Sequence, residues 1–194
     1  MNPTKKITYE YDCGNGFKQS FTIIPTSNSI IINEKNFPDD IFRKYVSENI
    51  DKDSDGIISI DETIKTNMID VANMEIFDLT GIEYFAELKS LDCRWNWITK
   101  LDVSYNTKLE NLDCSINFIE SLDVSKNTIL DVLCCSENML KSLDISNNKV
   151  LKKLHCHSNN LTSLDIFNCS DIKTFSAEKN TYDINFIDSR FDLS

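Results

Sequence analysis

Residues 112–159 carry the sequence LDCSINFIESLDVSKNTILDVLCCSENMLKSLDISNNKVLKKLHCHSN, which matches itself when it is shifted by 21 residues. The same register extends through five turns without gaps, and one apolar column contains Leu91, Leu112, Leu133, Leu154 and Phe175. Two residues later a second column contains Cys93, Cys114, Cys135, Cys156 and Ala177, and three residues beyond it lie Asn96, Asn117, Asn138, Asn159 and Asn180. A fixed period of this length is typical of a solenoid, in which each turn packs only against its neighbours.

The spacing LxxLxCxxNxL is a leucine-rich-repeat consensus. It predicts a short strand in every turn, because alternate residues of a strand point to the same side and the leucine and the cysteine would both face inward. Stacked strands would pair as a parallel sheet with a spacing of about 4.8 Å. The asparagine side chain would bond backbone groups that are left unpaired where the chain turns. We therefore expect an α/β solenoid of 21-residue repeats.

Three segments of the chain differ in pattern. Residues 1–33 alternate polar and apolar residues around the sequence CGNG at residues 13–16, which predicts a β-hairpin. Residues 34–75 predict a helical cap, and residues 76–194 predict the solenoid, with a short helix near residues 82–85. Residues 182–193 break the repeat, and we expect them to cover the C-terminal end of the core as a cap.

The cysteines follow the repeat and not an irregular disulfide pattern. Cys93, Cys114, Cys135 and Cys156 lie 21 residues apart, at one apolar position of each turn. A thiol at such a position behaves as a small buried hydrophobic group. We therefore expect free, buried thiols in these turns. With 41% hydrophobic residues, the chain is able to bury a core without disulfide bonds.

The other half of each turn repeats the pattern LDVS or LDIS, followed by asparagine, and aligns Asp102, Asp123, Asp144 and Asp165. Carboxylates stacked in this way repel one another unless each accepts hydrogen bonds from its own turn. Two interpretations remain at this point. The aspartates cap the local turns, which is the ordinary role of such residues, or they form a ladder that binds cations.

An acidic loop precedes the repeats. Residues 51–62, DKDSDGIISIDE, match the complete calcium-loop template D-x-[DN]-x-[DN]-G-x5-E. We expect the ligands to be the carboxylates of Asp51, Asp53, Asp55 and Glu62, the carbonyl of Ile57, and a water held by Ser59. Residues 38–49 and 61–66 predict flanking helices. Without a cation the four carboxylates would repel one another, so Ca²⁺ is the expected cofactor.

The charge and hydropathy of the chain exclude several classes of partner. The formal net charge is -11, which disfavours nucleic acid and anionic membranes as partners. No apolar run approaches the roughly 18 to 20 residues of a membrane span, so we expect no membrane insertion. Residues 1–6 contain no apolar signal core, and we expect a cytosolic chain or one that has been trimmed.

Three stretches resemble a known group of proteins: residues 32–62, the sequence LTGIEYFAEL at residues 79–88, and the alternating units such as LDCSINFIESLDVSKNT at residues 112–128. Together they make the chain similar to the internalin-like leucine-rich-repeat surface proteins of bacteria. The resemblance implies an N-terminal helical cap that carries the calcium loop. It also implies a secreted or cell-surface location and a role in binding proteins or glycans of a host or neighbouring cell. It supplies no catalytic residues.

The residues beside the inward-facing leucine and cysteine should face solvent and form the binding surface. Its candidate residues are Arg94, Trp95, Ile116, Cys134, His155 and His157. Trp95 and Ile116, with Trp97 and Phe118, would form an exposed apolar patch near the N-terminal turns, since aromatic residues dominate many protein interfaces. Ordinary packing at the rim of the solenoid is the alternative.

Two other functions stay open on the sequence alone. Cys134 lies beside His155 and His157 on neighbouring strands, an arrangement that would suit a thiolate pair or a zinc site. The sequence shows neither an oxyanion hole nor a pocket for an enzyme, so we expect no enzymatic activity. The net charge also suits a cytosolic inhibitor or immunity-type protein that blocks a basic target.

Overall fold

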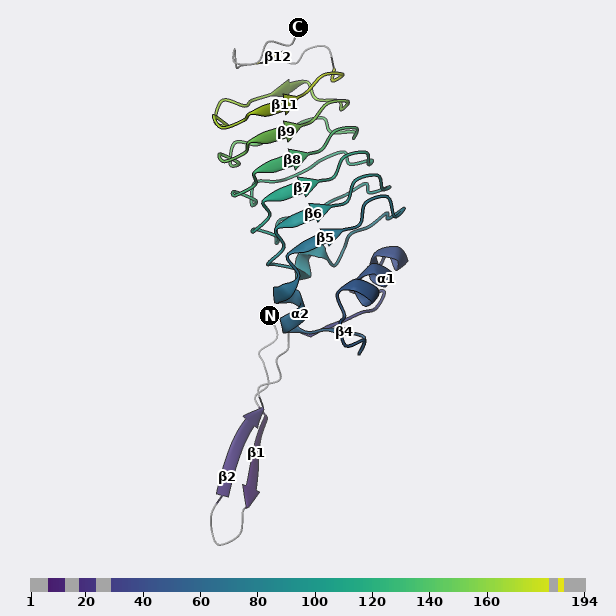
Figure 1. Ribbon diagram of the computed structural model, residues 1–194, viewed down its shortest axis with the longest axis vertical. Coiled ribbons are helices and arrows are strands. Elements are labelled where there is room, and N and C mark those ends of the chain that lie inside the picture. The colour runs from purple at the N-terminus through teal and green to yellow at the C-terminus, as the bar shows by residue number, and fades with distance from the viewer. Residues whose placement is uncertain (1–6, 13–17, 24–28, 182–184, 187–194) are drawn as a thin grey trace.

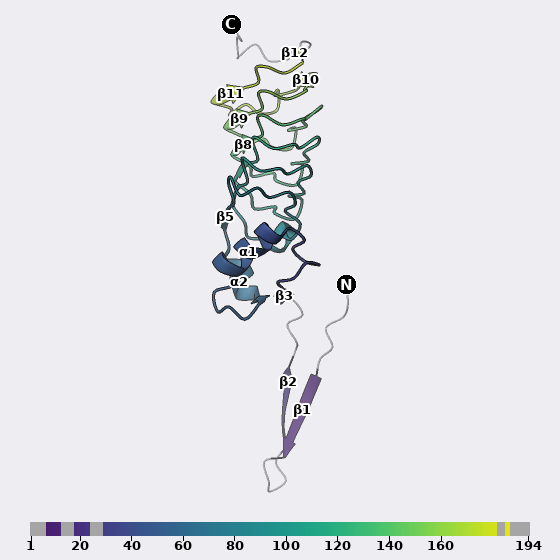
Figure 2. The same ribbon diagram turned by 90° about the vertical axis from the view of Figure 1, so that its right-hand side faces the viewer.

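The computed structural model describes residues 7–12, 18–23, 29–181 and 185–186. Its centre is a coil of stacked turns whose strands lie along one side of the molecule (Figures 1 and 2). One six-stranded parallel sheet has the order β5-β6-β7-β8-β9-β11 read from the N-terminal end. Its strands are β5 (Met68–Asp70), β6 (Ser90–Asp92), β7 (Asn111–Asp113), β8 (Val132–Cys134), β9 (Lys153–His155) and β11 (Thr174–Ser176).

The register of this sheet is the register of the sequence repeat. Leu91 lies opposite Leu112, which lies opposite Leu133, and the column continues to Leu154. These four leucines are at most 1% exposed, and burial of each side chain contributes about 1.5–3 kcal/mol. Cys93, Cys114, Cys135 and Cys156 are buried free thiols, which confirms the expectation for the cysteines. The parallel solenoid of about five repeats is thus the predicted one.

The sheet begins one strand earlier than the repeat pattern indicates. β5 pairs in parallel with β6, with Ile69 opposite Leu91, although residues 68–70 belong to the segment assigned to the cap. The offset between these two residues is 22, not 21, and Val71 stands where later turns have cysteine. The register is therefore hidden in the sequence, while the buried apolar side chains of Ile69 and Val71 are still sufficient to continue the core.

A buried asparagine ladder fastens each turn to the one before it. The Nδ2 group of Asn117 donates to the carbonyl oxygens of Cys93 and Cys114, at 3.0 and 3.1 Å, and its Oδ1 accepts from the N–H of Ile98 at 3.0 Å. Asn138 and Asn159 make the same three bonds one and two turns further on. The predicted capping role is confirmed, and it reaches across two turns.

A second asparagine ladder runs through the other half of the turns. Asn106, Asn127 and Asn148 are completely buried. Nδ2 of Asn127 donates to the carbonyl oxygens of Val103 and Asn106, at 3.0 and 2.9 Å, whereas the Oδ1 atoms of these three asparagines have no hydrogen-bond partner. The second ladder therefore uses only its donors. Cys169 takes the next place in this column, where its Sγ lies 3.6 Å from the carbonyl oxygens of Ile145 and Asn148.

The aligned aspartates cap their local turns. Oδ1 of Asp102, Asp123 and Asp144 accepts from the N–H two residues later, and Asp165 does the same with Phe167. The hydroxyl and N–H of Ser125 lower the pKa of Asp123, and the N–H and hydroxyl of Ser146 lower the pKa of Asp144. Of the two interpretations, turn capping is the one that these bonds bear out.

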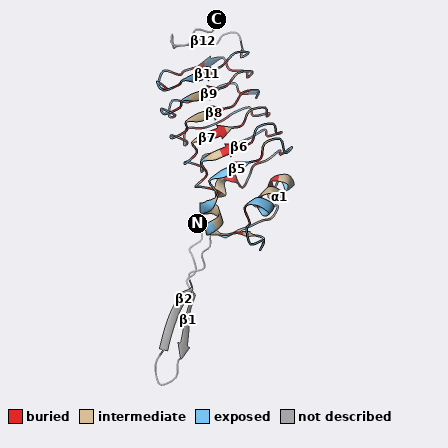
Figure 3. Ribbon diagram, in the orientation of Figure 1, coloured by how far each residue is buried: buried red, intermediate tan, exposed pale blue. Residues whose placement is uncertain are grey.

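Ahead of the sheet, the chain forms two helices joined by the acidic loop. These are α1 (Asp40–Asn49) and α2 (Ile60–Lys65), and in the same segment β3 (Ile30–Ile31) pairs antiparallel with β4 (Ile57–Ile58). Asp39 caps α1 by accepting from the N–H groups of Ile41 and Phe42. The red segments in Figure 3 mark where α1 and the strands face the core.

The first turn of the solenoid packs directly on this helical segment. A short 3₁₀ helix, η1 (Ile82–Tyr84), lies where a short helix is predicted. It begins after Gly81, whose φ is 110°. A Cβ atom at Gly81 would lie 2.3 Å from Cδ1 of Phe37, so only glycine allows Phe37 to approach this closely.

Two further strand pairs lie outside the main sheet. β1 (Ile7–Asp12) pairs antiparallel with β2 (Lys18–Ile23), while the connection at residues 13–17 lies outside the described residues. Near the C-terminus, β10 (Ser163–Leu164) pairs in parallel with β12 (Asn185–Phe186). Most of the predicted C-terminal cap, residues 182–193, is not among the described residues. No helix in the described part has the length and apolar character of a membrane span.

Candidate functional site

The acidic loop closes on its own backbone. Asp51 is buried, and its two carboxylate oxygens accept from the N–H groups of Asp55, at 3.3 Å, and Gly56, at 3.0 Å. Asp55 in turn accepts from the N–H of Ile57 at 2.8 Å. Gly56 has a φ of 80°, a conformation that glycine adopts without steric cost. Asp51, Asp55 and Gly56, the first, fifth and sixth positions of the predicted calcium loop, therefore stabilise the turn of the loop.

Three of the expected ligands come together. Oxygen atoms of Asp51, Asp53 and Asp55 all lie within 4.8 Å of one another. Desolvation, and then the negative charge of Asp55, raise the pKa of Asp53. A raised carboxyl pKa means that the ionised form of Asp53 is disfavoured among its neighbours. Hard, closely spaced carboxylate oxygens are the ligand type that Ca²⁺ prefers, so this donor set fits the ion.

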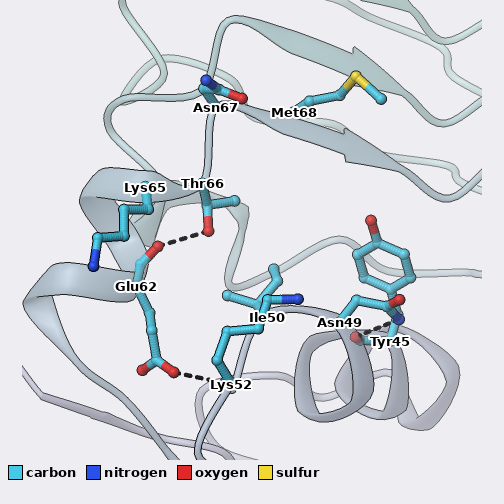
Figure 4. A pocket seen from close by; sticks show the side chains of 9 residues that line it. All are labelled: Tyr45, Asn49, Ile50, Lys52, Glu62, Lys65, Thr66, Asn67 and Met68. Atoms are coloured by element: carbon cyan, nitrogen blue, oxygen red, sulfur yellow. Dashed lines mark hydrogen bonds between the residues drawn. The ribbon is translucent and has the colours of Figure 1, made fainter.

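Glu62, the expected closing ligand, is engaged locally. Its Oε2 accepts from the N–H of Ser59 at 2.8 Å and from the Ser59 hydroxyl at 2.7 Å, and its Oε1 accepts from the N–H of Lys52 at 2.7 Å. Figure 4 shows the carboxylate directed at Lys52. Desolvation opposes ionisation of Glu62, but the hydrogen bonds from Ser59 and Lys52 outweigh it and lower the pKa. Ser59 and Glu62 thereby form a capping box that starts α2.

The loop is anchored on its apolar side. Ile57, expected to supply a carbonyl ligand, lies in β4 opposite Ile31, and the next residue, Ile58, is completely buried. A cavity of about 240 Å³ lies beside Glu62, and its lining includes Tyr45 of α1, Thr66 just after α2 and Met68 of β5 (Figure 4). None of the three clustered aspartates lines it. Lys52 and Glu62 of the loop do line the cavity, so the loop and the cavity adjoin while the aspartate cluster lies outside it.

The outward side of the sheet is polar and carries paired charges at its N-terminal end. Nε of Arg94 lies 3.4 Å from Oδ2 of Asp92, and its Nη1 lies 3.9 Å from Oδ2 of Asp113 on the next strand. Asp70 of β5 lies beside Asp92 in the same row. Desolvation and the charge of Asp113 raise the pKa of Asp92. Arg94 is therefore exposed, as expected, but its charge is shared between two carboxylates.

Cys134 was predicted to face solvent, but it is buried although it lies on the outward side of β8. It is only 7% exposed, because it lies between Asp113 of β7 and His155 of β9, its neighbours in register. Desolvation, and then Asp113, raise the pKa of Cys134, while desolvation and Lys153 lower the pKa of His155. The thiol and the imidazole are thus both favoured in their neutral forms. His157 is half-buried, and Cys134, His155 and His157 are not among the described groups whose ligand atoms converge.

Shortly after its C-terminal end, each strand leads into a sharp turn, and these turns together form one long edge of the sheet. Trp95, Ile116, Glu137, Ser158 and Lys179 all have φ between 53° and 58°, and each immediately precedes a ladder asparagine. Trp95 is 58% exposed and Ile116 is half-buried. A groove of about 370 Å³ runs along this edge, lined by Trp95, Trp97, Ile116 and Phe118, with Glu75 of the preceding turn and Glu137 of the following turn. The predicted apolar patch is present, but on the edge and not on the outward side of the strands.

Two members of this patch were missed from the sequence. The Phe77 ring meets the Trp97 ring edge-on, with centroids 4.6 Å apart, and Met139 is 44% exposed. Met139 follows Trp97 and Phe118 at the 21-residue spacing, so the column itself was the signal that would have found it. Phe77 lies ahead of the regular repeats and carries no such signal.

Comparisons with known proteins place this architecture. No family model matches the chain. The functional domain of internalin J from Listeria monocytogenes, described as including a cysteine ladder, superposes with a TM-score of 0.76 at 33% sequence identity over 83% of this chain. In sequence, internalin J of the serotype 4b strain F2365 is 37% identical over 70 residues. The chain is therefore a leucine-rich-repeat protein that resembles internalins in sequence and fold.

Other solved structures share the fold with this internalin-like chain. Internalin F of L. monocytogenes superposes with a TM-score of 0.56 at 20% identity over 80% of the chain, and internalin C2 with 0.55 at 15% identity over 82%. At these identities only the fold is common. The chain spans 8% of the length of internalin J and 35% of the solved internalin J chain. This chain also has a ladder of buried thiols, formed by the column Cys93, Cys114, Cys135 and Cys156.

Proposed function

We propose that this internalin-like chain is a binding module for a protein on another cell, and that it works outside the cell that makes it. The observation that carries the proposal is the six-stranded parallel sheet, whose outward side presents Arg94, His155 and His157 next to an exposed aromatic edge. Similarity to internalins supports it, because a leucine-rich-repeat solenoid provides an extended surface for recognition. A glycan ligand on the same surface is the alternative outcome of the test.

The experiment uses the chain immobilised on beads and a detergent extract of biotinylated surface proteins from epithelial cells. Bound material is measured after treatment of the extract with protease or with glycosidases. We expect protease to abolish retention and glycosidases to leave it unchanged. Retention lost only with glycosidases would replace the protein ligand with a glycan, and no retention above empty beads would overturn the proposal.

Matched variants locate the surface. The triple variant Arg94→Ala, His155→Ala, His157→Ala removes side chains from the outward side of the sheet. The control variant Ser121→Ala, Ser142→Ala changes exposed residues on the other half of the turns. Truncation of a central interface residue costs about 1 kcal/mol or more, and one kcal/mol corresponds to about a fivefold loss of affinity. We expect the first variant to lose binding and the second to retain it.

We also propose that the acidic loop binds Ca²⁺ and that the ion stabilises the helical segment under the first turn. The support is the convergence of Asp51, Asp53 and Asp55 on one point and the raised pKa of Asp53, because a divalent cation removes the repulsion among these carboxylates. Ser59 would hold a bridging water and Ile57 a carbonyl ligand. Glu62 would complete the ligand set only after releasing the N–H groups of Lys52 and Ser59.

Thermal unfolding in chelator and in calcium tests this second proposal. A site with a dissociation constant of about 10⁻⁴ M stabilises the fold by about 2.7 kcal/mol when the calcium concentration is about a hundred times that constant. The double variant Asp53→Asn, Asp55→Asn should lose the calcium response. The control Asp61→Asn, an exposed aspartate of α2 outside the cluster, should keep it. Equal melting curves of the wild-type chain in chelator and in about 10 mM calcium would exclude a site in this affinity range.

A further inference from the structure

The apolar edge of the sheet is the feature that the proposed function leaves without a defined ligand. Its exposed side chains are Phe77, Trp95, Trp97, Phe118 and Met139, between 44% and 58% exposed. Both tryptophans of the chain line the groove. The groove volume, about 370 Å³, falls within the range of about 300–1,000 Å³ that is usual for ligand pockets. An apolar cluster of this kind on a protein surface marks an interaction site.

The repeat itself builds this edge as a ladder. Trp97 donates its backbone N–H to the carbonyl of Ile76, and Phe118 donates to the carbonyl of Ile98, each 2.9 Å away in the preceding turn. The next residue of each turn, Ile98 or Ile119, is completely buried. Trp97 and Phe118 therefore cannot reach the core, because the neighbouring isoleucine already fills it. Their large side chains are held outward by the backbone, one turn apart.

The backbone of the groove is strained where its apolar side chains arise. Trp95 and Ile116 have φ values of 58° and 56°, and for a β-branched residue such as isoleucine this region is a marked outlier. The same position holds Glu137, Ser158 and Lys179 in later turns, so the repeat does not demand an apolar residue there. Two bulky apolar residues thus occupy, in adjacent turns, a position at which asparagine or glycine would fit with less strain.

The charges that line the groove are all negative. Among the described residues the charged groups in its lining are Glu75 and Glu137, which are exposed. Neither forms an ion pair within the described part of the chain. The nearby cation Arg94 is committed to Asp92 and Asp113. The electron-rich faces of indole and phenyl rings also attract cations, and Trp does so most strongly.

We propose that this groove binds a cationic, partly apolar peptide segment of the partner protein. A lysine or arginine of the segment lies against the rings of Trp95 and Trp97 between Glu75 and Glu137, and flanking apolar residues pack on Phe118 and Met139. The inference rests on the proposed protein-binding function and specifies the chemistry of its ligand. The floor of aromatic rings supplies contact area, and the two carboxylates select the positive charge.

Intrinsic tryptophan fluorescence tests the proposal directly, because the signal of the whole chain comes from this groove. The probe is a short synthetic peptide amide of alternating arginine and leucine. Its controls are the same peptide with citrulline, a neutral isostere, or with glutamate in place of arginine, and a neutral oligosaccharide. We expect the arginine peptide to shift and quench the emission in a saturable way, the citrulline peptide to bind about 5- to 30-fold more weakly, and the other two to have no effect.

Two matched double variants separate the groove from general electrostatics. Glu75→Gln with Glu137→Gln should weaken binding of the arginine peptide by about 2- to 30-fold, from two exposed charge pairs. Glu34→Gln with Glu48→Gln makes the same change of net charge on exposed residues of the helical segment and should leave binding within twofold of the wild-type chain. Trp97→Leu keeps Trp95 as the reporter and should weaken binding by more than fivefold.

Three results would overturn the proposal: equal binding of the arginine and citrulline peptides, equal binding by the two glutamate double variants, or a response to the oligosaccharide alone. Failure of this inference is distinct from failure of the proposed function. Retention of surface proteins by the Trp97→Leu chain at the wild-type level would reject the groove as their site and leave the binding module intact. Loss of all retention by the wild-type chain would reject the module itself.

Discussion

The two buried asparagine ladders should differ in how much stability is lost when one of their asparagines is truncated. In Asn117→Ala, the carbonyl of Cys93 keeps its bond from Asn96, and the carbonyl of Cys114 keeps its bond from Asn138. The N–H of Ile98 loses its partner and stays buried. A buried donor without a partner costs about 1–3 kcal/mol, and the weakened carbonyl bonds add to it, so we expect a loss of about 2–4 kcal/mol.

Asn127→Ala is the matched control from the second ladder. The carbonyl of Val103 keeps the N–H of Asn106, and the carbonyl of Asn106 keeps the N–H of Leu109. No donor is orphaned, and the truncation removes an Oδ1 atom that has no partner. Because the two substitutions delete the same atoms from buried sites, the difference between them isolates the orphaned N–H. We expect Asn127→Ala to be less destabilising by about 1 kcal/mol or more.

Urea unfolding followed by far-ultraviolet circular dichroism measures both losses, with thermal melting as a second readout. For a chain of this size, one kcal/mol lowers the melting temperature by about 2–4 °C. Asn117→Ala should therefore melt about 4–16 °C below the wild-type chain, and Asn127→Ala a few degrees below it. Equal losses for the two variants, with unchanged unfolding cooperativity, would refute the assignment of the acceptor role to the first ladder alone.

Three further predictions concern strain, acid stability and thiol reactivity. Ile116→Asn places a residue that tolerates left-handed backbone in the edge position and should raise the melting temperature by a few degrees while weakening peptide binding; a lower melting temperature contradicts the strain argument. The pKa of Glu62 is lowered in the folded state, so its contribution to stability is present above its ordinary pKa of 4.5 and is lost as pH falls through the lowered value. Glu62→Gln should therefore make the free energy of unfolding less dependent on pH between pH 6 and about pH 2. An unchanged pH dependence contradicts this. Burial raises the pKa of Cys156 to about 12 and that of Cys114 still further, so mass spectrometry should find these thiols unmodified by iodoacetamide in the native state and alkylated in urea.

The repeat made most of the fold predictable. Leu112, Cys114 and Asn117 each have one role in every turn, and identical turns stack only in one register, so the columns of the sequence are the columns of the core. β5 escaped prediction because Ile69 is offset by 22 residues and Val71 replaces the cysteine. A strand of three residues forms when its side chains are buried and a neighbouring strand pairs with it. Neither condition produces a recognisable sequence motif.

The surface was harder to predict than the core. Cys134 was placed correctly on the outward side of β8, but its burial depends on Asp113 and His155 of the neighbouring strands. Trp95 and Ile116 were expected on the sheet and lie at its edge, because the left-handed residue before the ladder asparagine turns the chain away from the strand direction. Backbone conformation of this kind follows from the stacked turns, so a single strand pattern does not contain it.

We expect partners to bind the solenoid on its sheet side and along its aromatic edge. Site-specific photo-crosslinking tests it most directly, with the photoreactive amino acid placed at Ser115 beside the groove or at Ser121 on the other half of the same turn. After exposure to the extract of surface proteins, the chain labelled at Ser115 should form a discrete covalent adduct, and the chain labelled at Ser121 should form none. An adduct from Ser121 with none from Ser115 would contradict the claim.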